Sequence, residues 1–77
     1  MITPDQIKQW IEKGMACEQV SVEGDGRHFE AVVVSELFSE KKLIERHRMV
    51  YEALGDRMKS DIHALSLQTQ TPQEHTA

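Results

Sequence analysis

The sequence has few of the residues that would indicate a disulfide framework, a membrane span or a base-stacking surface. It contains one cysteine, Cys17, so no disulfide can form within the chain, and a reducing compartment fits this composition. Aromatic residues make up only 5% of the chain, and no long uncharged apolar run is present. The first residues lack the basic and apolar regions of a secretory signal. We therefore expect a cytoplasmic protein with no membrane segment.

Motifs of enzymes and of complete metal sites are also absent from the sequence. There is no Cys-x-x-Cys, His-Glu-x-x-His, calcium loop, P-loop or dinucleotide fingerprint, and Gly24-Asp25-Gly26 is interpreted as a hairpin turn. None of the four histidines has a nucleophile beside it, and Cys17 is interpreted as a small buried apolar residue. The chain is therefore not expected to be an enzyme, and any metal would be shared with another chain.

Length and charge limit the remaining possibilities. The 77 residues are enough for one domain, residues 1–77, which can bury only about 60% of its unfolded surface. The formal charge of −4 disfavours non-specific nucleic-acid binding. Lys41, Lys42, Arg46 and Arg48 nevertheless outnumber Glu40 and Glu45 and leave a mildly positive strip.

Hydrophobic periodicity predicts two helices. Thr3 can cap the first, Pro4 suits its first turn, Gln6 completes a capping box, and Gly14 lies near its end. Its apolar stripe consists of Ile7, Trp10, Ile11 and Met15. Ser39 can cap the second helix, which Gly55-Asp56 ends or breaks. One face of this second helix carries Leu43, His47, Val50 and Leu54, with Ile44, Tyr51 and Met58 beside it.

Alternating and β-branched residues predict three strands. Val20 and Val22 begin a hairpin that turns at 24–26 and returns through 29–34, where the valine run 32–34 indicates the middle of the sheet. A third strand is predicted over 62–69 and a helical turn at 71–74, with the tail from about residue 72 expected to fray. The order α-β-β-α-β is typical of an α+β domain with helices packed on one face of a three-stranded sheet.

Several of these segments together resemble a known family. Phe38, Arg46-His47-Arg48-Met49-Val50-Tyr51, Ile62-His63-Ala64-Leu65 and Thr71-Pro72 occur in an order and spacing that closely resembles the BolA/YrbA family. The resemblance covers nearly the whole chain. It implies a KH-like fold with a mixed sheet, a partnership with monothiol glutaredoxins, and a role in handling 2Fe–2S clusters and iron homeostasis. Members of the family are also often described as transcriptional regulators.

The resemblance also implies two cluster ligands. The family's characteristic histidine near the third strand corresponds to His63, and its variable ligand in the loop joining the first two strands corresponds to His28. A glutaredoxin and its bound glutathione would supply the other ligands, so we expect the isolated apo protein to be a monomer without a cofactor. Because only neutral imidazole can ligate iron, cluster binding is expected to weaken below about pH 6.5.

Simpler roles for these residues remain open at this point. A lone strand histidine is more often a hydrogen-bonded structural group than a ligand; the resemblance reverses this for His63 and leaves both roles open for His28. His47 fits packing or hydrogen bonding within the second helix, and His75 fits a solvated tail. Arg46 and Arg48 either pair with acids on their own helix or form a partner-binding surface with His47, which we favour.

The rival function is that of a DNA-binding regulator. A KH-like domain could present the helix over residues 39–54, or a sheet edge, to nucleic acid. However, the chain has no Gly-x-x-Gly loop, few aromatic residues and an acidic balance. We therefore expect weak DNA binding at most.

Overall fold

A mixed three-stranded sheet lies at the centre of the fold, with β2 as its middle strand. The computed structural model describes residues 2–57 and 64–77. In it, β1 (Gln19–Gly24) pairs antiparallel with β2 (His28–Val34), and β2 pairs parallel with β3 (Ala64–Gln70). The strand order β1-β2-β3 confirms the central position predicted from the valine run. The first two residues of the predicted third strand, positions 62 and 63, and Met58 of the predicted second helix lie outside the described residues.

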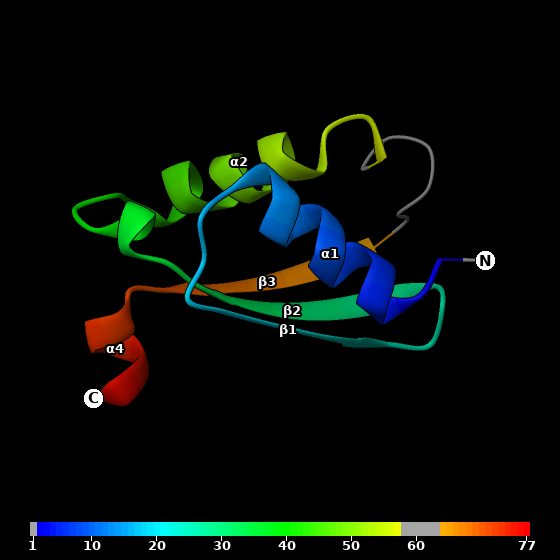
Figure 1. Cartoon of the computed structure of the whole chain (residues 1–77), viewed down its shortest axis with the longest axis horizontal. Coiled ribbons are helices and arrows are strands. Elements are labelled where there is room, and N and C mark those ends of the chain that lie inside the picture. The colour runs from blue at the N-terminus through cyan, green and yellow to red at the C-terminus, as the bar shows by residue number, and fades with distance from the viewer. Residues whose placement is uncertain (1, 58–63) are drawn as a thin grey trace.

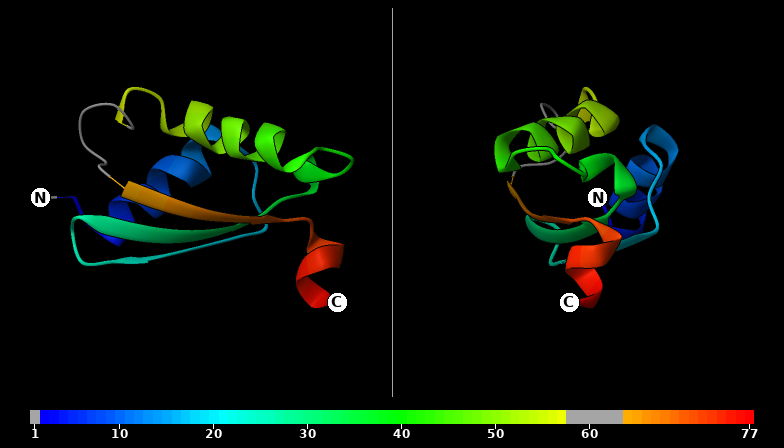
Figure 2. Two further views of the ribbon diagram at one scale, coloured as in Figure 1. Left: turned by 180° about the vertical axis from the view of Figure 1, so that it is seen from behind. Right: turned by 90° about the vertical axis from the view of Figure 1, so that its left-hand side faces the viewer.

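Two helices cover one face of this sheet. Figures 1 and 2 show α1 (Pro4–Gly14) and α2 (Leu43–Leu54) on the same side, with α1 packed against β1 and α2 above β3. The predicted capping box of α1 is confirmed, because Gln6 N–H donates to Thr3 Oγ1 at 3.2 Å and Thr3 N–H donates to Gln6 Oε1 at 2.9 Å. The predicted α+β fold is therefore confirmed.

The core fills the space between the helices and the sheet. Alternate side chains of β2 face the helices, as the period of a strand requires. Ser35, just after β2, is also buried, and its hydroxyl donates to Ala16 O at 2.6 Å while accepting from Leu37 N–H at 3.1 Å. The buried apolar cluster consists of Ile7, Ile11, Val20, Phe29, Val33, Phe38, Val50 and Leu54.

The start of α2 differs from the prediction. Ser39 does not cap this helix; it ends a short 3-10 helix, Glu36–Phe38, which Ser35 caps. The N-cap residue of α2 is Lys42, whose backbone N–H donates to Glu45 Oε1 at 3.1 Å. The turn after Phe38, in which Glu40 adopts φ 61°, moves the helix start three residues along the chain. The capping side chain of Ser39 therefore predicted the wrong start for α2. Residues 36–38 form a turn of their own, and the buried Phe38 holds that turn against the core.

The end of α2 and the C-terminal helical turn follow the sequence prediction. Gly55 ends α2 with φ 63°, a conformation that favours glycine. The predicted C-terminal helical turn is α4 (Pro72–Thr76), in which Thr71 and Glu74 form a capping box. Fraying of this tail stays a prediction. Within the described part of the chain, no helix has the length and apolar character needed to cross a membrane.

Candidate functional site

The turn between β1 and β2 sets the position of His28, the first residue of β2. Asp25 Oδ1 accepts hydrogen bonds from the backbone N–H groups of Arg27 and His28, each at 2.9 Å. These hydrogen bonds, that from His28 foremost, lower the pKa of the Asp25 carboxyl. Residue 24 is glycine because a Cβ there would lie 2.5 Å from the backbone oxygen of His28. The predicted hairpin turn is confirmed, and its hydrogen bonds hold the backbone of His28.

The side chain of His28 is exposed at this end of the sheet. It borders a shallow hollow of about 370 Å³, whose other lining residues include Asp25, Glu30, Ala64 and Ser66. In the parallel β2–β3 register, the Cα partner of His28 is Ala64. The other predicted ligand, His63, lies outside the described residues, so its role stays a prediction.

The described residues do not form a complete metal site. Over residues 2–57 and 64–77, no group of three or more His, Cys, Asp or Glu side chains could hold a metal ion. A metal centre that includes His28 therefore needs ligands from outside this part of the chain.

Cys17 lies at the opposite end of the sheet from His28. The neighbouring Glu18 donates its backbone N–H to Val34 O at 2.8 Å, at the far end of β2. The Cys17 side chain is half-buried, its Sγ lies 3.5 Å from Met15 O, and burial, aided by the charge of Glu12, raises the pKa of its thiol. Cys17 is interpreted from the sequence as a small buried apolar residue; the structure packs it against the core but leaves it only half-buried.

Arg46, in the first turn of α2, joins this helix to β3 and α4. It does not pair with an acid on its own helix, as one of the two interpretations held: its guanidinium donates to both carboxylate oxygens of Glu74 in α4, at 2.7 and 3.2 Å. It also donates to Lys41 O at 2.9 Å and to Thr69 O at 3.3 Å, and lies 5.9 Å from the centre of the Phe38 ring. The Arg46 hydrogen bond lowers the pKa of Glu74 to about 2. Arg46 is therefore committed to contacts within the chain.

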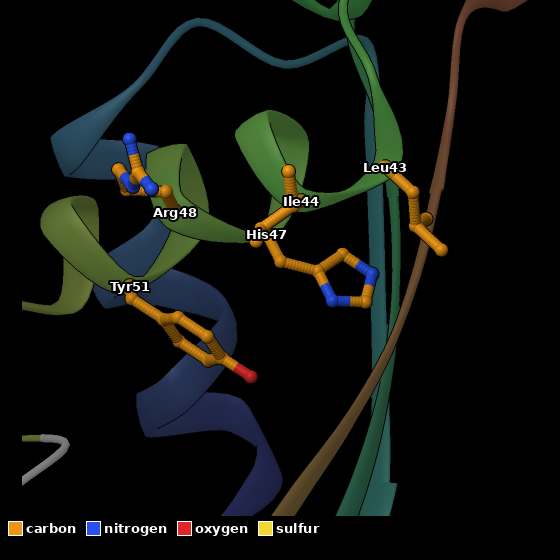
Figure 3. A pocket seen from close by; sticks show the side chains of 5 residues that line it. All are labelled: Leu43, Ile44, His47, Arg48 and Tyr51. Carbon is orange, nitrogen blue, oxygen red and sulfur yellow. The ribbon is translucent and has the colours of Figure 1, made fainter.

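An exposed apolar patch covers the outer face of α2. Its members line a hollow of about 400 Å³ (Figure 3), and we call them the α2 patch: Leu43, Ile44, His47, Arg48 and Tyr51. Leu43 and Ile44 are 65% and 67% exposed. The structure thus brings His47 and Arg48 of the predicted partner surface together on this face, whereas Arg46 is engaged with Glu74.

The remaining histidines have simpler surroundings. His47 meets the ring of Tyr51 edge-on, with ring centres 6.4 Å apart, and its buried Nε2 has no hydrogen-bond partner among the described residues. This agrees with the packing interpretation of His47. His75 is exposed on α4, with Nδ1 3.0 Å from Gln70 Oε1.

Sequence reasoning missed the exposure of Leu43. It placed Leu43 on the same face as Val50 and Leu54, and those two are buried, but Leu43, two turns earlier, is 65% exposed. Periodicity gives the direction in which a side chain points. It does not give how far along the helix the covering layer extends. The sequence signal that could have indicated the exposure of Leu43 is the run of apolar residues at the start of α2.

Comparison with known proteins gives consistent results. The BolA model, described as BolA-like protein, matches residues 11–74. Protein BOLA2 of Arabidopsis thaliana is 44% identical over 79 residues, covering 96% of this chain and 84% of that protein. The structure of a bolA protein homologue from Coxiella burnetii is 55% identical, covers 100% of both chains and gives a TM-score of 0.93. The DNA-binding transcriptional regulator BolA of Escherichia coli (strain K12) is 39% identical over 51 residues, which cover 66% of this chain and 49% of that protein, about half its length.

Proposed function

Because the chain belongs to the BolA-like family, we propose that it is a non-enzymatic adaptor that binds a monothiol glutaredoxin and shares a 2Fe–2S cluster with it. In this role it serves iron–sulfur cluster trafficking and iron homeostasis. The names of the relatives described above are those of BolA proteins and a regulator, and none is the name of an enzyme. The cytoplasm, where thiols stay reduced, is the compartment that we propose.

The position of His28 carries this proposal. Its exposed imidazole stands at the start of β2, and its Cα partner across the strand pair is Ala64. Neighbouring strands lie about 4.8 Å apart. His63, the second proposed ligand, is joined to Ala64 by one peptide bond. Positions 28 and 64 thus meet at one end of the sheet, and the proposed second ligand, His63, is the residue directly before position 64.

The donor set of this chain fits a shared cluster better than a resident one. Clusters of this kind take four ligands, and a pair of histidines can replace two cysteines on one iron, which raises the reduction potential. The one cysteine, Cys17, is half-buried at the opposite end of the sheet, so thiolate ligands would come from the glutaredoxin and glutathione. This chain then contributes imidazole ligands, and the Asp25 hydrogen bonds hold the backbone from which the His28 side chain extends.

The test is anaerobic reconstitution of this protein with a monothiol glutaredoxin and glutathione. Visible circular dichroism and native mass measurement would follow the wild type, His28→Ala and His63→Ala. His75→Ala is the matched control, because His75 is an exposed histidine on α4, beyond the other end of β3. We expect a heterodimer whose spectrum changes in His28→Ala and His63→Ala but not in the control. Failure to form a heterodimer, or identical spectra in all four proteins, would contradict the proposal.

A second candidate function is DNA-binding regulation, which the name of the Escherichia coli relative favours. The positive strip at the start of α2 is the feature that would contact phosphate. Arg46 is already paired with Glu74, which leaves Lys41, Lys42 and Arg48 for that contact. We therefore rank this function second. Titration of labelled duplex DNA at increasing salt tests it: sequence preference with a steep salt dependence supports a regulator, and absence of both removes it.

A further inference from the structure

The outer edge of β3 has backbone groups that β2 does not use. In a strand, the N–H and C=O groups of successive residues point alternately to the two sides. Gln70 O accepts from Ser35 N–H at 2.9 Å, so the backbone of Gln70 faces β2. By alternation, the backbone groups of Leu65, Leu67 and Thr69 face away from β2. The strand order places no other strand of the described residues on that side.

Arg46 closes one end of this edge. Its Nη1 donates to Thr69 O at 3.3 Å, which independently shows that the carbonyl of Thr69 faces outward. The outward groups of Leu65 and Leu67 receive no hydrogen bond from a side chain or loop among the described residues. Each residue carries one backbone donor and one acceptor, so Leu65 and Leu67 together offer two of each.

Protective features that usually guard an edge strand are missing from β3. Natural edges are blunted by charged side chains, proline or bulges. The seven residues of β3, Ala-Leu-Ser-Leu-Gln-Thr-Gln, contain no charge and no proline. The register from His28↔Ala64 to Val34↔Gln70 is continuous, so there is no bulge. The open edge is therefore regular enough to accept another strand.

The α2 patch lies on the helix that packs above β3. Figures 1 and 2 show α2 running over this strand, and the Arg46 hydrogen bond to Thr69 O ties the two together. Leu43 and Ile44 are 65% and 67% exposed and Tyr51 is 39% exposed. Among the described residues, Arg48 is the one charged side chain that lines the α2 hollow. In this part of the structure, the β3 edge thus has an apolar wall with the positive charge of Arg48 beside it.

We propose that the β3 edge and the α2 patch together bind a short extended segment of a partner protein by strand addition. The segment pairs with the backbones of Leu65 and Leu67. Its apolar side chains, at every second position, contact the α2 patch, and an acidic side chain pairs with Arg48. Main-chain hydrogen bonds combined with pockets for alternate side chains are the means by which sheet edges recognise peptides. Because Arg46 occupies Thr69 O, the paired stretch is short.

Geometry and composition favour a peptide over the other occupants of such an edge. Two copies of this chain paired through β3 would place their strands about 4.8 Å apart, whereas helices above them need about 8–10 Å between axes. Since α2 runs above β3, two α2 helices would collide. Single-stranded nucleic acid needs several stacking rings. Tyr51 is the one aromatic residue of the α2 patch besides His47, and Phe29 and Phe38 are buried.

Nuclear magnetic resonance titration of the ¹⁵N-labelled apo protein tests this proposal without any cluster or glutaredoxin. The probe is a panel of acetylated and amidated heptapeptides with Val or Ile at alternate positions and Asp at either end. We expect members of the panel to bind with saturable shifts of the Leu65 and Leu67 amide signals. N-methylation of alternate peptide nitrogens removes the strand hydrogen bonds but keeps the side chains, and should weaken binding at least tenfold.

Two variants distinguish peptide binding at this site from non-specific hydrophobic adhesion to the protein surface. Ile44→Asp places a charge in the α2 patch and should weaken peptide binding at least tenfold; Leu37→Asp, at an apolar residue that is 46% exposed outside the patch, should leave it unchanged. The proposal is overturned if no peptide binds below about 1 mM or if N-methylated peptides bind equally well. It is also overturned if a thymidine decamer alone shifts these signals, or if they shift with protein concentration because the chain pairs with itself.

Discussion

Gly14 sets the distance between α1 and α2, and its replacement by alanine is the most direct test of this packing. A Cβ at position 14 would lie 2.7 Å from both Cβ and O of Ala53, and 2.8 Å from its Cα. Real Cβ atoms do not approach other atoms so closely, and two of these three atoms belong to the α2 backbone. Gly14→Ala must therefore push α2 away from α1, and with it the α2 patch.

The expected cost follows from two opposing effects. Overpacking of this kind destabilises proteins by about 1–3 kcal/mol. Alanine is a better helix residue than glycine by up to about 1 kcal/mol, and by less at Gly14, the last residue of α1. We therefore expect Gly14→Ala to lower the free energy of unfolding by about 1–2 kcal/mol. In a domain of this size, each kcal/mol lowers the melting temperature by about 4–8 °C.

Urea unfolding followed by far-ultraviolet circular dichroism measures this change, with Lys13→Ala as the exposed neighbouring control. The control should change stability by no more than about 0.5 kcal/mol. Ala53→Gly removes only one of the three close atoms, so the double-mutant cycle with Gly14→Ala should give a coupling energy below about 0.5 kcal/mol. If Gly14→Ala stabilises the protein, helix propensity decides the outcome and the close approach of the helices is refuted.

Three further predictions concern the ends of α2 and α4. Gly55→Ala should destabilise the protein by about 1–3 kcal/mol although nothing lies within 4 Å of the new Cβ, because φ is +63°; unchanged urea stability would refute backbone strain as the reason for glycine there. Glu74→Gln keeps a capping side chain but removes the charge that Arg46 holds, so hydrogen exchange of the α4 amides at neutral pH should speed up, while Gln73→Glu, on the same helix, should not have this effect. The hydrogen bond from Arg46 lowers the pKa of the Glu74 carboxyl from its ordinary value of 4.5 to about 2. Its stabilising contribution is therefore complete above about pH 4.5 and is lost as pH falls toward 2. Carbon-13 titration of the Glu74 carboxyl checks this, and a midpoint near 4.5 would contradict the pairing.

Local chemistry in the sequence determined most of the elements. The Thr3-Pro4-Asp5-Gln6 capping box, the glycines of the 24–26 turn and Gly55 each act within a few residues of the chain, so their effect can be recognised without a fold. The valine run 32–34 marked the central strand because only a strand covered by neighbours keeps such a run. The order of the elements and the position of His28 at the hairpin end followed from these signals.

Tertiary structure alone decided which distant residues meet. Arg46 and Glu74 are 28 residues apart, and their pairing depends on how α2 crosses β3 and where α4 begins. The exposure of Leu43 depends on how far the covering layer extends along α2, and the start of α2 depends on the contacts of residues 36–38. The open edge of β3 results from parallel pairing with β2, which joins segments more than 30 residues apart. Such long-range geometry has no local signal because it is fixed by packing between elements, each of which would form the same local pattern elsewhere.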